Sequence, residues 1–315
     1  MSGREKPSSP GFSAGTRRRF RFRPRVWAGL LLLVALGVVI HQLWQRYAPV
    51  VARHPQYQIT ADRIHITPQP EYIHADIKAQ VLRDSGLLDN LSVLQDDQEL
   101  NRRVREAFEF NPWVLGVRKI TKGLPSSLDV ELTYRVPVAA VELADSSSVS
   151  YLPVDVYAIR LPEADMADVL RRYLPRVTGI ISRPPIGEVW NDPRVIGGAH
   201  LAAALSDVWK QLRLVEIIPS SHVEVRGDVQ FYTFEIISSG GTRIAWGAPP
   251  GEEQEAGESP FTVKRQRLLD FVAGTAVLDS INGPEVLDVR RELKVVPRTA
   301  RRETTETPAE ATTTK

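Results

Sequence analysis

Residues 111–139 read NPWVLGVRKITKGLPSSLDVELTYRVPVA, and this stretch decides the fold of the region around it. Apolar and polar residues alternate from Leu128 to Tyr134, which is typical of a β-strand with one buried and one wet face. Trp113–Ile120 is predicted to be another strand, and Lys122–Pro125 supplies the turn between the two. Trp113 itself is expected to lie in the core.

Two helices are predicted before these strands. The first, residues 71–85, places three apolar side chains on one face: Ile73, Ile77 and Val81. The second begins at Asp96, which can cap it in a capping box with Glu99, and its apolar residues recur every four positions: Leu100, Val104 and Phe108. With a candidate strand at 57–66, the order over residues 55–140 is strand, helix, helix, strand, strand.

An apolar run lies nearer the N-terminus. Residues 27–44 read WAGLLLLVALGVVIHQLW, and no charged residue occurs between Arg25 and Arg46. A helix of this length is about 27 Å long, close to the roughly 30 Å hydrocarbon core of a bilayer. We therefore predict a transmembrane helix at 26–46, with Trp27 and Trp44 as interfacial anchors. A cleaved signal peptide, for which a small-residue cleavage pattern is missing, and a buried soluble helix are the alternatives.

Charge is distributed unevenly along the chain. Residues 1–25 hold eight Arg or Lys and one Glu, which gives them a net charge of +7. Because the whole chain has a net charge of +2, the remaining residues carry a net charge of −5. By the positive-inside rule this basic arm is cytoplasmic and everything after Arg46 is exported. A mildly acidic body argues against nucleic-acid binding. The absence of cysteine excludes disulfides and thiolate chemistry.

Residues 141–298 are predicted to be mostly strands with two helices, at 201–214 and 264–273, so that the fold class is α+β. The Pro- and Gly-rich segments 182–198 and 247–260 are expected to be inserted loops, the second of them mobile. The last ordered strand is expected at 285–296. The tail, 299–315, is Thr- and Glu-rich and is expected to be disordered.

Catalytic motifs are missing from the sequence. It contains no G-x-S-x-G, P-loop, G-x-G-x-x-G or H-E-x-x-H pattern, and its six histidines are scattered. We therefore predict no catalytic residue, no metal, no cofactor and no small-molecule substrate, and we expect the protein not to be an enzyme.

The motifs of residues 55–140 are similar to those of a known domain family. The 55–140 unit resembles a POTRA domain, and specifically that of the FtsQ/DivIB cell-division family, in which a "PWV" strand, a Pro turn and an "R-x-P-V-A" strand end follow one another. The matching positions here are Pro112, Trp113, Val114, Pro125, Leu128, Val130, Arg135, Pro137, Val138 and Ala139. Residues 174–179 (LPRVTG), Lys264 and residues 287–290 (LDVR) resemble later family motifs in the family's order, although Val289 replaces a leucine.

This resemblance implies a divisome scaffold in the cytoplasmic membrane, at the division septum. Its domain at 141–298 would be of the FtsQ type and would bind bitopic partners of the FtsB/FtsL type outside the cytoplasm by strand addition. The predicted partner-binding residues lie in the last strand: Leu287, Asp288, Val289, Arg290, Arg291, Leu293 and Val295. Two alternatives remain, a POTRA-containing envelope transport or outer-membrane assembly factor and a membrane-tethered envelope enzyme.

Overall fold

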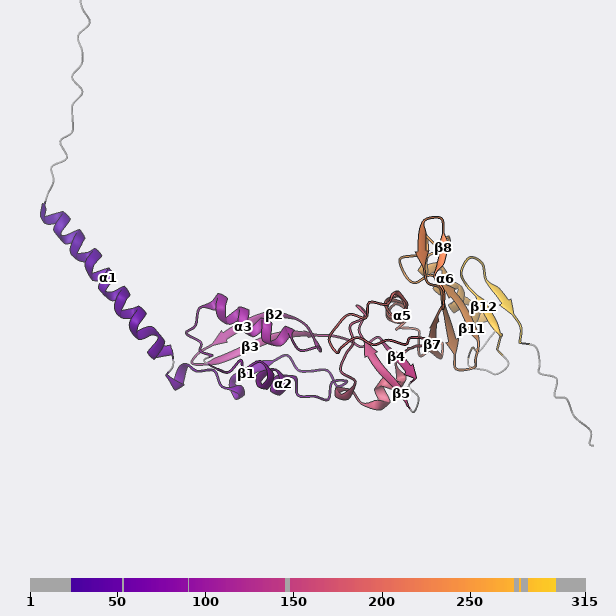
Figure 1. Ribbon diagram of the computed structural model, residues 1–315, viewed down its shortest axis with the longest axis horizontal. Coiled ribbons are helices and arrows are strands. Elements are labelled where there is room, and N and C mark those ends of the chain that lie inside the picture. The colour runs from indigo at the N-terminus through magenta and orange to yellow at the C-terminus, as the bar shows by residue number, and fades with distance from the viewer. Residues whose placement is uncertain are drawn as a thin grey trace, which may run out of the picture. The chain divides into compact units, whose positions relative to one another are not determined.

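The computed structural model describes residues 24–52, 54–89, 91–144, 148–274, 278 and 283–298. Two compact units divide the chain at Pro55. The first contains one helix, α1 (Pro24–Ala52), of which Ala28–Tyr47 is long and apolar enough to cross a membrane and is not buried by protein (Figure 1). Trp44 is exposed on it, whereas the side chain of Trp27 lies outside the described residues. The predicted basic arm, up to residue 23, and the tail, 299–315, also lie outside them.

The second unit has a mixed α+β fold with two main sheets. The smaller sheet has the order β1-β3-β2, in which β1 runs parallel and β2 antiparallel to β3. Its elements are β1 (Ile64–Ile66), β2 (Val114–Gly123), β3 (Ser127–Tyr134) and the helices α2 (Ile77–Asp84) and α3 (Asp97–Glu109). The predicted order of these five elements is therefore observed.

The helix α3 follows the sequence pattern closely. Asp96 caps it by accepting hydrogen bonds from the backbone N–H groups of Gln98 and Glu99. The capping box is not completed, because the Glu99 carboxylate binds Arg102 instead. The apolar stripe is fully buried: Leu100, Val104 and Phe108.

Two predictions in this region overestimated regular structure. Only the last three residues of the strand expected at 57–66 pair with β3, because short 3-10 turns form at Pro55–Tyr57 and Ala61–Arg63. The helix expected at 71–85 begins only at Ile77, where Asp76 caps it. Trp113, in contrast, is fully buried as expected, and its Nε1 donates to Asp165 over 3.1 Å.

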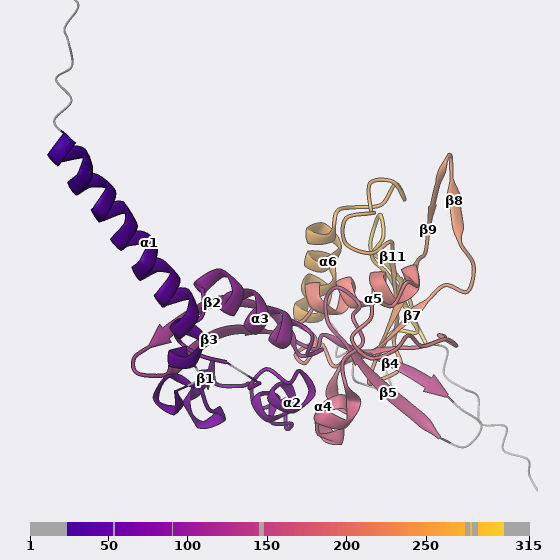
Figure 2. The ribbon, with the colours of Figure 1, turned by 60° about the vertical axis from the view of Figure 1, so that its left-hand side comes forward.

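The larger sheet has eight strands in the order β13-β12-β11-β10-β7-β6-β4-β5, and β8 and β9 form a separate hairpin that projects from it (Figure 2). The strands are β4 (Ala139–Ala144), β5 (Val149–Val154), β6 (Arg176–Val177), β7 (Leu214–Pro219), β8 (Glu224–Arg226), β9 (Val229–Phe231), β10 (Phe234–Ser238), β11 (Arg243–Gly247), β12 (Val286–Asp288) and β13 (Lys294–Val296). The helices are α4 (Asp168–Tyr173), α5 (Pro193–Ala204) and α6 (Phe261–Gly274), with a 3-10 turn at Glu163–Asp165.

The helix α5 corrects the predicted loop at 182–198 and helix at 201–214. It begins at Pro193, capped by Asp192, and ends at Ala204. Gly197 and Gly198, which suggested a loop, lie inside this helix. Larger residues would not fit at these positions, because their β-carbons would collide with the side chains of Phe234 and Val177. The glycines therefore allow α5 to pack closely on the sheet, where it contacts β4, β6 and β7.

Contacts connect the two sheets within the second unit. Leu161 and Met166, which follow β5, are buried in the core of the smaller sheet. Arg135, at the end of β3, forms an almost buried ion pair with Asp155 over 2.7 Å. The predicted division at residue 140 thus falls inside β4, close to where the chain passes from one sheet to the other.

Candidate partner-binding edge of the large sheet

The strand predicted at 285–296 is in fact a hairpin of two short strands, which corrects the sequence expectation. β12 pairs in parallel with β11 on one side and antiparallel with β13 on the other, so β12 lies inside the sheet and β13 forms its edge. The chain leaves β12 at Asp288, whose carboxylate accepts from the backbone N–H of Arg290 over 3.0 Å. Such a side-chain-to-backbone bond is a common way to start a turn.

Five of the seven predicted partner-binding residues separate into a buried and an exposed group. Leu287 and Val289 are fully buried in the core, so neither side chain is open to a partner at the surface. Arg291, Leu293 and Val295 are exposed, Val295 by 45%. Sequence alternation alone could not separate the groups, because it did not locate the turn.

Asp288 and Arg290 bind one another. Two hydrogen bonds join the guanidinium to the carboxylate, at 2.8 and 3.1 Å, while the Arg290 side chain stays 44% exposed. Burial opposes ionisation of Asp288, but the hydrogen bonds from the Arg290 side chain and backbone hold the pKa of Asp288 below its ordinary value. Arg290 is therefore pre-oriented by its own chain, with part of its guanidinium still open to water.

The register shows which backbone groups of β13 are open. Arg243 N–H donates to Glu285, and Val289 N–H donates to Ala245, so the odd-numbered residues of β12 face β11. The even-numbered residues then face β13, where Asp288 is opposite Lys294 and Val286 is opposite Val296. Backbone direction alternates along a strand, so the N–H and C=O of Val295 point away from the sheet. This edge can accept one more strand.

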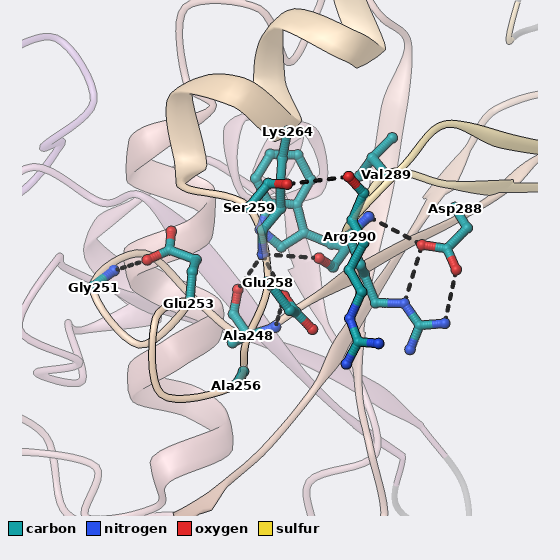
Figure 3. A network of polar contacts seen from close by, with 12 residues as sticks. Ala248, Gly251, Glu253, Ala256, Glu258, Ser259, Lys264, Asp288, Val289 and Arg290 are labelled. Carbon is teal, nitrogen blue, oxygen red and sulfur yellow. Dashed lines mark hydrogen bonds and ion pairs between the residues drawn. The ribbon is translucent and has the colours of Figure 1, made fainter. Parts of the chain in front are cut away.

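Behind the hairpin lies an almost completely buried ion pair that the sequence did not predict (Figure 3). The Lys264 ammonium, on α6, donates to Glu258 over 2.6 Å and to the backbone carbonyls of Trp246 and Ala248 over 3.1 and 3.2 Å. It also lies 5.4 Å from the ring centre of Trp246. Burial lowers the pKa of Lys264 below its ordinary value, although Glu258 opposes the shift. Lys264 lies four residues before Leu268, on the same buried face of the helix. This spacing was the one feature of the sequence that indicated burial of Lys264.

The ion pair fixes residues 248–260, which make up nearly all of the mobile insertion predicted at 247–260. Gly247, at φ +85°, carries no side chain because the Glu258 carboxylate occupies the space of a β-carbon. Ser259 N–H then donates to Arg290 C=O over 2.8 Å, and its hydroxyl donates to Arg291 C=O over 3.2 Å. The segment is irregular, as expected, yet it is bonded to the turn between β12 and β13.

Arg267 adds a further connection to this turn. Its guanidinium donates to Val289 C=O and to the Ser259 hydroxyl, both over 2.9 Å. α6 therefore holds the start of the turn directly, through Arg267, and indirectly, through Lys264 and Glu258. The position of the β13 edge depends on these buried and half-buried charges.

A small charged pocket lies beside the hairpin. Its volume is about 240 Å³, and its lining includes Glu258, Asp288, Arg290, Arg291, Glu292 and Lys294. Ligand pockets are usually larger, about 300–1,000 Å³, and more apolar. Within the described ranges no three His, Asp or Glu side chains are grouped to hold a metal ion.

Comparison of the sequence with known protein-family models and with curated proteins gives no match in either case.

Proposed function

We propose that the protein is a divisome scaffold resembling the FtsQ/DivIB family, tethered in the cytoplasmic membrane by α1. Its second unit lies outside the cytoplasm, and residues 55–140 form a POTRA-like region. The β13 edge binds a strand of an FtsB/FtsL-type bitopic partner. The observation that carries this proposal is the outward-facing backbone of Val295 beside the exposed part of Arg290, in an edge strand whose outer side pairs with no other strand of the described residues.

Physical features of β13 support strand addition. Main-chain hydrogen bonds from Val295 provide affinity, while the exposed side chains of Leu293, Val295 and Val296 and the charged pocket provide specificity. Lys294 lies within this apolar edge and Pro297 follows it directly, and such residues protect edge strands from uncontrolled pairing. The edge is thus suited to a selected partner and is protected from self-aggregation.

A test of this proposal removes one outward-facing hydrogen-bond donor, the backbone N–H of Val295. In the full chain, Val295→Pro deletes an N–H that the β12–β13 ladder does not use, so the fold is retained and co-purification of an FtsB-type protein falls by on the order of tenfold or more. Val295→Thr keeps the N–H and is the matched control, expected to bind as the wild type does. Equal recovery of the partner with both variants contradicts the docking assignment. Deleting 285–298 would be a poor test, because it removes the internal strand β12.

The location of the protein in the cell tests the proposed division role separately from the docking assignment. A fluorescent fusion of the full chain is expected to give a ring at midcell in dividing cells. An even signal around the envelope would contradict the division role and would favour a transport or assembly role instead.

A further inference from the structure

The opposite edge of the large sheet, β5, is open over part of its length. Near its end it is covered by the chain that follows, because Val154 bridges Arg160 and the N–H of Leu161 donates to the C=O of Pro153 over 2.8 Å. Among the described residues no strand or bridge pairs with the outer side of residues 149–152. The open part therefore spans the first four residues of the strand.

The hydrogen bonds identify the outward-facing backbone groups of β5. Ala140 N–H donates away from β5, to Pro175, so its register partner Pro153 faces outward, as the bond from Leu161 also shows. Alternation along the strand then places the N–H and C=O groups of Tyr151 and Val149 on the outer side. A proline at an outward position, here Pro153, costs no ladder bond.

A groove accompanies this open edge. It has a volume of about 320 Å³ and is lined by residues 148–152 together with Glu163, Asp168, Arg171 and Arg172. Glu163 is paired with Arg160, and Asp168 with Arg171. Arg172 is exposed and forms no ion pair within the described part of the chain. One cation thus remains available to a carboxylate of an incoming segment.

Apolar side chains stand next to this cation. Val169 and Tyr173, on the same short helix α4, are 61% and 73% exposed. The groove, the outward-facing backbone of residues 149–152 and the apolar and basic side chains of α4 fit an extended peptide whose residues alternate between apolar and acidic. Antiparallel pairing of two copies of this edge would bring the Arg172 side chains of both copies to one groove, which like-charge repulsion disfavours.

We propose that residues 149–152 of β5 and the exposed face of α4 form a second docking edge, which takes an extended acidic segment of another protein. This inference is independent of the proposed function, because it concerns the other end of the sheet and requires no division partner. The added strand pairs with Val149 and Tyr151 through the backbone, and one of its carboxylates binds Arg172.

The experiment uses the full chain in detergent micelles and a fluorescent probe peptide, acetyl-Thr-Val-Glu-Val-Glu-Val-Thr-amide. Tyr151→Pro removes the outward N–H and is expected to weaken binding by about tenfold or more in fluorescence anisotropy. Tyr151→Val keeps the N–H and is the matched control, expected to bind within a factor of about two. Thermal unfolding of both variants verifies that the sheet is retained.

Charge exchange provides a second test that leaves the backbone untouched. Arg172→Glu is expected to weaken binding of the acidic peptide and to favour a probe in which lysine replaces both glutamates. Val295→Pro, at the other edge, is expected to leave the affinity unchanged. Absence of peptide binding, unchanged affinity in Tyr151→Pro and Arg172→Glu, or a loss only in Val295→Pro would each overturn the proposal. Concentration-dependent self-association that the peptide abolishes would also overturn it, since it assigns the edge to a second copy.

Discussion

The two ends of the eight-stranded sheet differ in how the protein supports and covers them. β13 is the outer strand of a hairpin that is bonded to α6 and to the segment 248–260 through buried charges. The end of β5 is covered by the chain that follows it, and beside its open part the carboxylate of the Asp168–Arg171 ion pair is 71% exposed. The difference indicates that the β13 edge is held in a fixed position from inside the protein, whereas the β5 edge is shaped mainly at the surface.

The largest expected effect tests this difference directly. Glu258→Ala leaves the buried Lys264 ammonium without its partner and should lower the free energy of unfolding by about 3–5 kcal/mol, less where the amine loses its proton. The matched change at the other edge, Asp168→Ala, breaks an exposed pair and should cost less than about 1 kcal/mol. The side chains of Glu258 and Asp168 are 6% and 71% exposed, which is the physical reason for the contrast.

Urea unfolding of the full chain, followed by tryptophan fluorescence, measures both values. Similar losses for the two variants would show that the buried pair does not hold the β13 end more firmly than the exposed pair holds the β5 end.

A smaller loss of stability is expected from a comparison within the hairpin, between a residue of the core and a residue of the proposed docking surface. Leu287→Ala removes a fully buried side chain from β12 and should cost about 2–5 kcal/mol of unfolding free energy. Leu293→Ala, in the exposed turn before β13, should stay within about 0.5 kcal/mol in the same assay. A large loss for Leu293→Ala would mean that the turn belongs to the core and is not available to a partner.

These contrasts also show what could be predicted from the sequence. Alternation between Leu128 and Tyr134 and the four-residue period from Leu100 to Phe108 located β3 and α3, because one-sided burial imposes these periods. The helix α5 was missed, because Gly197 and Gly198 serve a close approach to Phe234 and Val177 that only the tertiary fold defines. A local pattern cannot distinguish a glycine needed for packing from one that ends a helix.

The candidate site was located only in part, for a similar reason. Leu287, Val289 and Val295 look equivalent in sequence, but the turn that Asp288 starts places two of them in the core and one on the surface. The ion pair between Lys264 and Glu258 joins a helix to an irregular segment, and no period in the sequence relates these two residues. Long-range polar contacts of this kind become visible only in three dimensions.

The smallest expected effect concerns acid sensitivity at the β13 end. The pKa of Asp288 is lowered in the folded protein, so its contribution to stability is present above the ordinary value of 3.8 and is lost as the pH falls toward the lowered value. Asp288→Asn removes this contribution, and the free energy of unfolding should therefore fall less steeply between about pH 5 and pH 3 than in the wild type.

Asp192, whose pKa is also lowered, remains in both proteins, so the difference between the two pH profiles reports Asp288 alone. Tyr151→Val, at the β5 end, should leave the slope of the profile unchanged. Parallel profiles for the wild type and Asp288→Asn would show that the bond between Asp288 and Arg290 does not stabilise the turn, and that the guanidinium of Arg290 is not held in place before a partner binds.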